Sequence, residues 1–222
     1  MTQDALQLYV GEKNISSWSM RAFIALRVKG VPFEETTIPL REDKDRARRR
    51  RVSPTGKVPV LHHGSLVIPD SLAIIEYLEE IFPAPAHPAL WPSDRAARAH
   101  ARWLAAAMHS GFMKLREGMS FNLCFLPEPP DPGAEALSEA AEMLSLWEQA
   151  LRRKPSGAAS FLFGAFGGVD AMYAPAVVRL KAFRAPTAET PLAAAYMDAV
   201  LAHGAVKRWL DAARALPPVA RY

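Results

Sequence analysis

Three short segments in the first third of the chain combine residue types that could bind a small molecule and activate an acidic group on it. The first reads Asn-Ile-Ser-Ser-Trp-Ser-Met-Arg at 14–21 and places Ser16 and Ser17 at or just before the start of a predicted helix. Free backbone N–H groups and the positive end of the helix dipole favour an anion at such a position, so a thiolate held there would be stabilised. A serine that only caps the helix produces the same pattern, and capping is the common role of an isolated Ser-Ser pair.

The second segment is Gly-Lys-Val-Pro-Val-Leu at 56–61, in which Pro59 stands at the beginning of a predicted strand. Proline cannot donate a hydrogen bond to a sheet, so its presence here needs a reason. A cis Val58–Pro59 peptide bond would turn the Val58 backbone toward an extended peptide ligand, although cis bonds are a small minority of X–Pro bonds. Taken alone, the segment favours an edge-strand proline.

The third segment is the pair Asp70-Ser71 at the start of another predicted helix. A carboxylate and a hydroxyl beside free helical N–H groups could bind a ligand that carries both an ammonium and a carboxylate group. A plain N-terminal cap explains the pair equally well. Each of the three segments is therefore weak evidence by itself.

Alternating strand and helix patterns position these segments up to about residue 82. Apolar runs, helical spacing and turn residues define the elements. Strands are predicted at 6–10, 33–40, 58–62 and 66–68, and helices at about 20–28, 42–51 and 70–82. The expected order is βαβαββα.

The composition changes after this region. Residues 83–93 contain four prolines and show no helical or strand period, which indicates a linker between domains. Apolar residues from 101 to 115 have the spacing of one long helix. A second helix is predicted to bury Leu137, Ala141, Leu144, Trp147 and Leu151, and shorter helices are predicted near 169–183, 192–203 and 206–214.

The order and spacing of these features resemble the cytosolic glutathione S-transferase family over nearly the whole chain. The resemblance is closest to serine-type, zeta-like members, whose signature begins Ser-Ser-x-Ser-x-Arg, as residues 16–21 do here. In the second half it depends mainly on Val-Asp-Ala-Met-Tyr-Ala-Pro at 169–175 and on length. It implies an α+β thioredoxin-like N-terminal domain at 1–82, a linker at 83–93, and an all-helical domain at 94–222 that forms the second-substrate pocket.

The resemblance also implies roles for individual residues. The Ser16 hydroxyl would hydrogen-bond the glutathione sulfur and favour the thiolate, with Ser17 as its neighbour and substitute. Which of the two serines contacts the sulfur remains open. The rest of glutathione would be held by the backbone of Val58 before a cis Pro59, by Asp70 and Ser71 at the γ-glutamyl end, and by Lys57 at a carboxylate. The second-substrate pocket would be lined by Trp18, Met108, Phe112, Leu115, Arg116, Met119 and Tyr173.

Core packing is the alternative for the methionine and aromatic residues of this expected pocket. Arg116 is different, because a charged group on an apolar face is seldom buried unpaired. It would meet an anionic co-substrate or extend into solvent.

Two positions depart from the family pattern. Trp18 stands where the zeta signature usually has cysteine, which puts maleylacetoacetate isomerase activity in doubt and would give the pocket an apolar wall. Gly167 stands where many relatives have a serine or threonine that forms a capping box with the residue equivalent to Asp170. Glycine has no side chain to complete the box, but Asp170 could still reach back to backbone donors, so we expect the helix to form.

The resemblance implies a glutathione-dependent transferase in which the bound thiolate attacks an electrophilic, largely apolar co-substrate. A glutathione-dependent isomerase or peroxidase could use the same site. A non-catalytic binding module of the same family is the alternative from another class, because fold does not fix function. By the family pattern, we expect a homodimer.

Composition limits the remaining possibilities. The 222 residues include 27 Lys and Arg against 23 Asp and Glu, a balance that gives no sign of nucleic-acid binding. The basic cluster, Arg46 and Arg48 to Arg51, is expected to be a solvated helix end, or else to attract glutathione or an acidic co-substrate. Cys124 is the only cysteine, which excludes an internal disulfide and a dithiol mechanism, and no ligand spacing suggests a metal. No long apolar run indicates membrane spanning or export, so a cytoplasmic location is expected.

Overall fold

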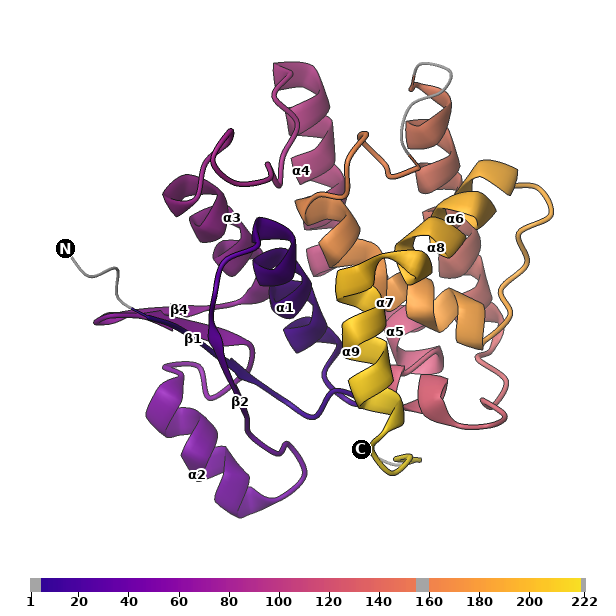
Figure 1. The fold of residues 1–222 in the computed structure, drawn as a ribbon. Helices are drawn as coiled ribbons and strands as arrows, with labels where there is room; N and C mark the ends of the chain where they lie inside the picture. Colours follow the sequence, from indigo (N-terminus) through magenta and orange to yellow (C-terminus); the bar gives the residue numbers. More distant parts are fainter. Residues whose placement is uncertain (1–4, 155–159, 221–222) are drawn as a thin grey trace.

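A mixed four-stranded sheet organises the first part of the chain (Figure 1). The structure is a computed structural model that describes residues 5–154 and 160–220. The sheet order is β2-β1-β3-β4, with β1 parallel to β2 and antiparallel to β3, and with β3 antiparallel to β4. The elements are β1 (Leu6–Val10), α1 (Ser17–Lys29), β2 (Glu34–Thr37), α2 (Asp43–Val52), β3 (Val60–His63), β4 (Leu66–Pro69) and α3 (Ser71–Ile81). The predicted βαβαββα order is confirmed.

Helix α1 lies at the centre of the molecule. It packs against β1 and α3 on one side and against α7 and α9 of the second part on the other. Residues from Met20 to Leu26 are buried all round the helix, which explains why its sequence shows little amphipathic pattern. Gly30 ends the helix in the left-handed conformation, with φ of 68°, which glycine adopts without steric cost.

The second part of the chain is helical (Figure 1). Its elements are α4 (Arg95–Ser110), α5 (Met113–Gly118), the 3₁₀ helix η1 (Phe121–Phe125), α6 (Ala134–Arg152), α7 (Gly168–Ala182), α8 (Pro191–Ala202) and α9 (Gly204–Arg214). Helix α7 forms the core of this part, and every residue from Gly168 to Leu180 is buried. No helix in the described part of the chain has the length and hydropathy needed to cross a membrane.

The prediction of one long helix across 101–115 is wrong. Helix α4 ends at Ser110, and α5 begins at Met113 after Phe112 takes a left-handed conformation with φ of 58°. The apolar residues that suggested a single helix, Ala101, Leu104, Ala105, Met108, Phe112 and Leu115, are nevertheless all buried. The burial pattern continues across the break, so periodicity alone did not detect it.

Helix α6 covers its predicted range, but the face that it buries differs slightly from the expected one. Leu144, Trp147 and Leu151 are buried as predicted. Leu137 is 36% exposed and Ala141 is also exposed, whereas Ala136, Ala140 and Met143 face the core. The buried face therefore includes alanines, which a count of large apolar residues does not reveal.

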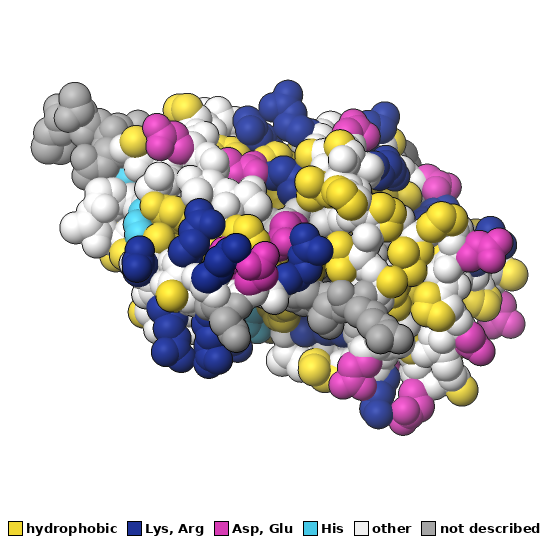
Figure 2. All heavy atoms as spheres, turned by 90° about the horizontal axis from the view of Figure 1, so that it is seen from below, with side chains coloured by type: hydrophobic (Ala, Val, Ile, Leu, Met, Phe, Trp, Pro, Cys, Tyr) yellow, Lys and Arg dark blue, Asp and Glu magenta, His cyan; other side chains and the backbone are white. Residues whose placement is uncertain are grey.

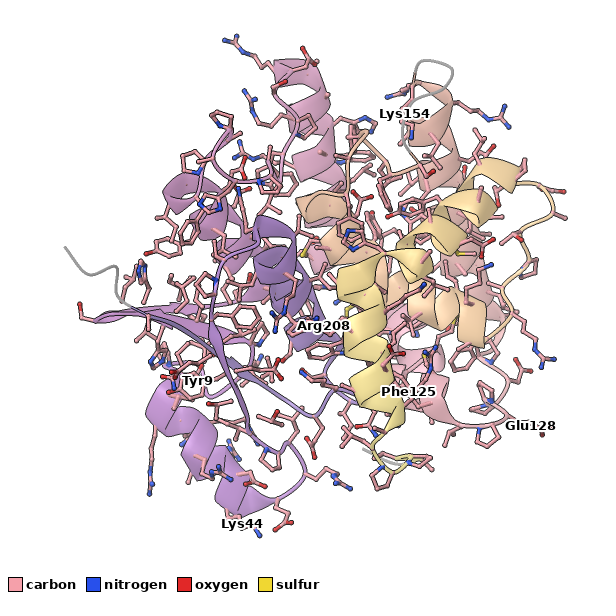
Figure 3. All side chains as sticks on the ribbon, viewed as in Figure 1. Tyr9, Lys44, Phe125, Glu128, Lys154 and Arg208 are labelled. Atoms are coloured by element: carbon pink, nitrogen blue, oxygen red, sulfur yellow. The ribbon has the colours of Figure 1, made fainter. Side chains whose placement is uncertain are left out.

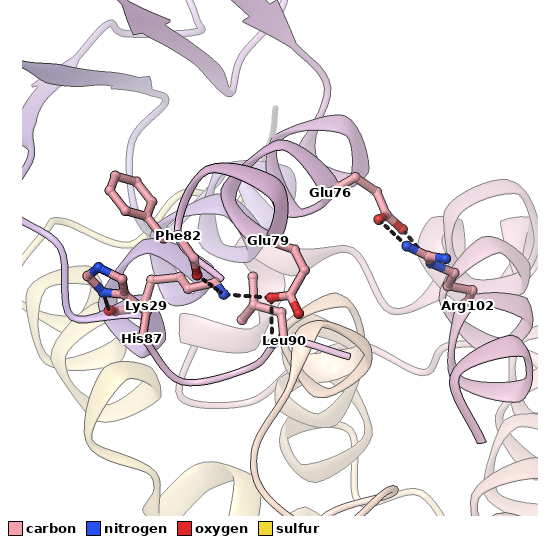
Figure 4. Close-up of polar contacts among 7 residues, drawn as sticks. All are labelled: Lys29, Glu76, Glu79, Phe82, His87, Leu90 and Arg102. Carbon is pink, nitrogen blue, oxygen red and sulfur yellow. Dashed lines mark hydrogen bonds and ion pairs between the residues drawn. The ribbon is translucent and has the colours of Figure 1, made fainter. Parts of the chain in front are cut away.

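The proline-rich segment 83–93 is held against both parts of the chain (Figure 4). Glu79 of α3 accepts hydrogen bonds through Oε2 from Lys29 Nζ at 2.5 Å and from Leu90 N at 2.9 Å. His87 Nδ1 bonds the Lys29 carbonyl at 3.1 Å, and Gly168 N of α7 donates to the Leu90 carbonyl at 2.7 Å. Leu90 and Glu79 therefore connect α1, α3 and α7 through a few polar contacts.

Loss of the Lys29 cation is expected to destabilise the fold. The Lys29 side chain is fully buried, and its ammonium also donates to the Phe82 carbonyl at 2.7 Å. Lys29→Met should lower the free energy of unfolding by roughly 2 to 3 kcal/mol, because Glu79 would remain largely buried without its cation. Urea denaturation followed by circular dichroism measures this.

The exposed pair Arg102–Glu76 in the same view provides the matched control (Figure 4). Its guanidinium donates Nη2 to Oε2 at 2.8 Å, but half of the arginine side chain faces solvent. Arg102→Gln should therefore cost less than about 1 kcal/mol. Equal effects of the two substitutions would contradict a structural role for the buried pair.

Candidate active site

Two adjoining cavities lie where the sheet-containing part meets the helical part. Trp18, Lys57 and Val58 belong to the walls of both. The first, of about 440 Å³, is lined by Trp18, Thr55, Lys57, Val58, Pro59, Pro69, Asp70, Ser71 and His109. The second, of about 450 Å³, is lined by Ile15, Ser16, Ser17, Trp18, Leu40, Arg49, Gly56, Lys57, Val58, Ser120, Phe121, Asn122 and Arg179. The three segments singled out in the sequence thus border one continuous region.

Ser16 and Ser17 form the N-terminal end of α1 at the second cavity. Ser16 is the N-cap, because its Oγ accepts from Ser19 N at 3.4 Å, and it donates its hydroxyl hydrogen to Ser19 Oγ at 2.7 Å. Ser17 Oγ accepts from Arg179 Nη2 at 3.3 Å. Arginine only donates, so the Ser17 hydroxyl hydrogen remains available to a ligand. Both serines are more than nine-tenths buried.

The Val58–Pro59 peptide bond is cis. Pro59 is buried and comes directly before β3, so it is not an edge-strand residue within the ladder. The paired register of β3 with β1 and β4 begins at Val60, which leaves the Val58 backbone outside the sheet and in the wall of both cavities. This is the geometry that the family resemblance implied.

Asp70 joins the two parts of the chain at the first cavity. Its Oδ1 caps α3 by accepting from Leu72 N at 2.8 Å and from Ala73 N at 3.2 Å. Its Oδ2 lies 3.4 Å from Nε2 of His109, which belongs to α4. The sequence indicated no role for His109, because only tertiary packing brings α4 to the start of α3.

Two arginines pack against the Trp18 ring. The Cζ atoms of Arg21 and Arg116 lie 4.2 Å and 4.9 Å from ring centroids of Trp18, within cation–π distance. The Arg21 side chain is fully enclosed, and burial, followed by repulsion from Arg116 and Arg179, lowers its pKa well below the ordinary value. Trp18 was expected to give the pocket an apolar wall. Positively charged side chains also lie beside its ring.

Several residues predicted for the second-substrate pocket lie in the core instead. Met108, Leu115, Met119 and Tyr173 have no exposed surface, and Phe112 is 8% exposed. None of these five lines either cavity. The Tyr173 hydroxyl donates to the Leu104 carbonyl at 3.0 Å. The apolar period of these helices marks the face that packs inside the helical part. A face of this kind has the same sequence pattern as the wall of a pocket.

Arg116 bonds the end of α4 instead of extending into solvent, and its expected contact with an anionic co-substrate stays a prediction. Its Nη2 donates to the carbonyls of Met108 and His109 at the end of α4, and its guanidinium faces Trp18. Burial lowers the pKa of Arg116. The residue thus caps the C-terminus of α4 and adds positive charge beside the cavities.

Arg179 is the functional candidate that the sequence did not reveal. It extends from α7 into the wall of the second cavity and bonds Ser17. The available signal was a single arginine in the otherwise apolar run Ala-Pro-Ala-Val-Val-Arg-Leu. Within the basic cluster, Arg49 also reaches this cavity while donating to the Gly56 and Pro39 carbonyls.

The rest of the basic cluster belongs to the surface of α2. Dark-blue Lys and Arg side chains gather over this part of the molecule (Figure 2). Lys44, near the start of α2, points away from the body of the protein and its side chain is 73% exposed (Figure 3). Except for Arg49, the cluster therefore has the character of a solvated helix surface.

Cys124 and the neighbouring histidines His62 and His63 take structural positions. Burial raises the pKa of the Cys124 thiol to about 12, so it is not a reactive thiolate at neutral pH. His62 and His63 bond the Val52 carbonyl and the Tyr77 hydroxyl, respectively. Among residues 5–154 and 160–220, no group of three His, Cys, Asp or Glu residues is arranged to hold a metal ion.

Two family models match the chain. The glutathione S-transferase N-terminal domain matches residues 15–81, and the glutathione S-transferase C-terminal domain matches residues 96–212. The chain belongs to the cytosolic glutathione S-transferase family. It is accordingly a glutathione-dependent enzyme, and the predicted thioredoxin-like domain followed by an all-helical domain is confirmed.

Relatives of this glutathione S-transferase come from several classes. It is 34% identical to glutathione S-transferase 1 of Dianthus caryophyllus over 88% of this chain and 87% of that protein. It is 40% identical to a probable maleylacetoacetate isomerase of Caenorhabditis elegans, but this match spans only 45% of either chain. These relatives establish the family and leave its class among transferases and isomerases open.

Solved structures agree over nearly the full length. A glutathione transferase homologue from Burkholderia with bound glutathione superposes with a TM-score of 0.70 and 28% identity, covering 96% of this chain and 100% of that one. The holo structure of a bacterial zeta-class maleylpyruvate isomerase gives a TM-score of 0.71 and 26% identity, covering 93% and 97%. Glutathione is thus the ligand of a close structural relative.

Proposed function

We propose that this protein is a serine-type glutathione transferase, similar to the zeta class, that activates glutathione at the N-terminus of α1. The observation that carries the proposal is the meeting of Ser16, Ser17, Val58 and Asp70 around two cavities that share a wall. The thiol loses its proton to solvent, and the thiolate forms a C–S bond to an electrophilic carbon of the co-substrate. The displaced electron pair departs with a leaving group, or moves onto the co-substrate and takes up a proton from water. The protein lowers the thiol pKa and positions the two reactants.

The charged and polar residues that line the two cavities support one orientation of glutathione. Its γ-glutamyl end, with an ammonium and a carboxylate, suits Asp70 and Ser71 in the first cavity. Its cysteinyl backbone pairs with Val58 at the shared wall, and its glycyl carboxylate lies toward Lys57 and Arg49 in the second. The co-substrate then lies against the Trp18 ring and the η1 side of the second cavity.

A pH titration of ultraviolet thiolate absorbance tests the proposal. Glutathione mixed with the wild-type protein should show a saturable thiolate signal well below the pKa of the free thiol. Calorimetry with glutathione at millimolar concentration accompanies the titration. A protein that neither binds glutathione nor forms the thiolate would be a non-catalytic member of the family, and the proposal would fail.

A glutathione-dependent isomerase is the second candidate. It is favoured by the arginines around Trp18, which suit a carboxylate-bearing co-substrate better than the largely apolar one expected from the sequence. Relatives named maleylacetoacetate isomerase and maleylpyruvate isomerase support it. Assays with both of these compounds, beside a neutral aromatic electrophile, distinguish the candidates by which substrate is turned over.

Asp70→Asn is expected to weaken glutathione binding roughly tenfold, because a neutral amide loses the charge that holds the γ-glutamyl ammonium. Asparagine has the same shape as aspartate and still caps α3 through its Oδ1. Isothermal calorimetry measures the dissociation constant. Asp94→Asn is the matched control, because Asp94 caps α4 through Ala97 N at 2.8 Å and borders neither cavity. An unchanged constant in Asp70→Asn would remove this residue from the site.

We also propose that the protein forms a two-fold dimer. Two large apolar side chains support this: Leu66 on β4 is 46% exposed and Trp103 on α4 is 52% exposed. Sedimentation equilibrium should give twice the mass of one chain. A value equal to one chain at micromolar concentration would contradict the proposal.

A further inference from the structure

Arg179 is a buried cation at the wall of the second cavity. Its side chain comes from α7 and the residue is 5% exposed. Nε donates to the Met119 carbonyl at 2.8 Å, and Nη2 donates to Ser17 Oγ at 3.3 Å. No carboxylate lies within 4 Å of the guanidinium in the part of the chain that the structure describes. Within the described residues, its hydrogen bonds therefore go to neutral acceptors, and no carboxylate neutralises its positive charge.

The surroundings of Arg179 disfavour the charged form of its guanidinium. Burial, with a smaller repulsion from Arg116, lowers the pKa of Arg179 to about 10, while Cys124 acts in the opposite direction. Arg21 adds a further cation behind Trp18, and Arg49 lies in the wall of the same cavity. Asp70, the acidic residue that lines the adjoining cavity, accepts a hydrogen bond at the N-terminus of α3 and lies in contact with His109.

An uncompensated buried cation favours an anion in the space that it faces. The other wall of that space is the N-terminus of α1, whose backbone N–H groups also favour an anion. Ser17 connects the two, since its oxygen accepts from Arg179 and its hydrogen is free to donate toward the cavity. Cation, hydroxyl and helix terminus thus converge on one position.

We propose that Arg179 is a thiolate-stabilising residue: it supplies the positive charge opposite the glutathione sulfur and orients the Ser17 hydroxyl toward it. The inference rests on the proposed function and deepens it. On binding, the S–H bond breaks, the electron pair stays on sulfur, and the proton passes to water. The helical part of the chain then takes part in activating the thiol, in addition to forming the co-substrate pocket.

Two other roles for Arg179 make different predictions. A purely structural arginine, holding η1 through Met119, would affect stability and leave the thiol pKa unchanged. An arginine that only binds a co-substrate carboxylate would affect the KM of that substrate. The pKa of bound glutathione, measured without a co-substrate, therefore separates the proposed role from both.

The experiment compares Arg179→Gln and Arg179→Lys with the wild-type protein by titration of ultraviolet thiolate absorbance. Glutamine keeps hydrogen-bond donors and loses the charge, and lysine keeps the charge on a single donor group. Arg179→Gln should raise the pKa of the bound thiol by about one unit or more, and Arg179→Lys should stay closer to wild type. Binding of S-methylglutathione, which has no ionisable thiol, should be little changed in either variant.

Lys181→Met is the matched control. Lys181 lies two residues further along α7, in an ion pair with Asp198 at 2.6 Å, and borders neither cavity. Removing its charge should leave the thiol pKa unchanged. A wild-type thiol pKa in Arg179→Gln would overturn the inference alone, whereas a wild-type protein without any thiolate signal would overturn the proposed function and this inference together.

Discussion

Ser16→Ala is expected to lower the turnover of glutathione conjugation roughly 100-fold, the usual effect of removing one hydrogen-bond donor from a developing or resident anion. The pKa of the bound thiol should rise in the same variant, while glutathione affinity at low pH stays close to wild type. The Ser16 hydroxyl now donates to Ser19 Oγ at 2.7 Å, so it must rotate toward the sulfur when the ligand binds. Steady-state kinetics and the ultraviolet titration measure both quantities.

Two comparisons make this result decisive. Ser17→Ala tests the hydroxyl that bonds Arg179. If the Ser17→Ala variant loses all activity while the Ser16→Ala variant keeps wild-type activity, the sulfur contact belongs to Ser17. Ser120→Ala removes a hydroxyl that borders the same cavity but donates to Asn122 Oδ1 at 2.6 Å, and should have little effect. Because Ser16 also caps α1, its variant loses about 1 kcal/mol of stability, so activities are normalised to folded protein.

Asp170→Ala is expected to cause the largest loss of stability, about 4 kcal/mol near pH 4.5, because two buried N–H groups lose their acceptor. Asp170 is fully buried, and its carboxylate accepts from Gly167 N at 2.8 Å and from Leu162 N at 3.2 Å. The expectation that Asp170 reaches back to backbone donors, so that α7 forms without a side chain at Gly167, is confirmed. Urea denaturation of both proteins at several pH values measures the difference.

The pH dependence of this difference has a definite sign. Burial raises the pKa of Asp170 from 3.8 to about 6, against the opposing effect of its backbone donors. A carboxyl whose pKa is higher in the folded state stabilises the fold most below its unfolded pKa, and this contribution is lost as the pH rises through about 6. The stability gap between wild type and Asp170→Ala should therefore shrink by up to about 3 kcal/mol between pH 4 and pH 7. A gap that widens with pH would show that the folded carboxylate is ionised throughout.

The sequence predicted the site residues that stand at the ends of local elements. Ser16, Asp70 and Pro59 each mark a place where a helix or strand begins, and such places are recognisable from cap and proline preferences. The structure brings all three to the two cavities, because the βαβαββα order places these element ends at one edge of the sheet. Their chemical roles remain predictions.

The sequence could not predict the contributions that depend on tertiary packing. His109 reaches the first cavity only because the end of α4 comes close to Asp70 at the start of α3, and Arg179 reaches the second because α7 packs against α1. Conversely, Met108 and Tyr173 have the right chemistry and spacing for a pocket wall but face the core. Helical periodicity identifies a buried face, and it does not distinguish a neighbouring helix from a ligand as the partner of that face.

The position of Trp18 has an optical consequence. The chain has five tryptophans. Trp91, Trp147 and Trp209 are at most 3% exposed and Trp103 lies on the outer surface of α4, whereas Trp18 belongs to the walls of both cavities. A ligand that enters either cavity displaces water from this one indole, between two guanidinium groups, and leaves the other four in their original environments. The protein thus carries its own fluorescent reporter of occupancy, and a single Trp18→Phe variant identifies which part of the emission belongs to the site.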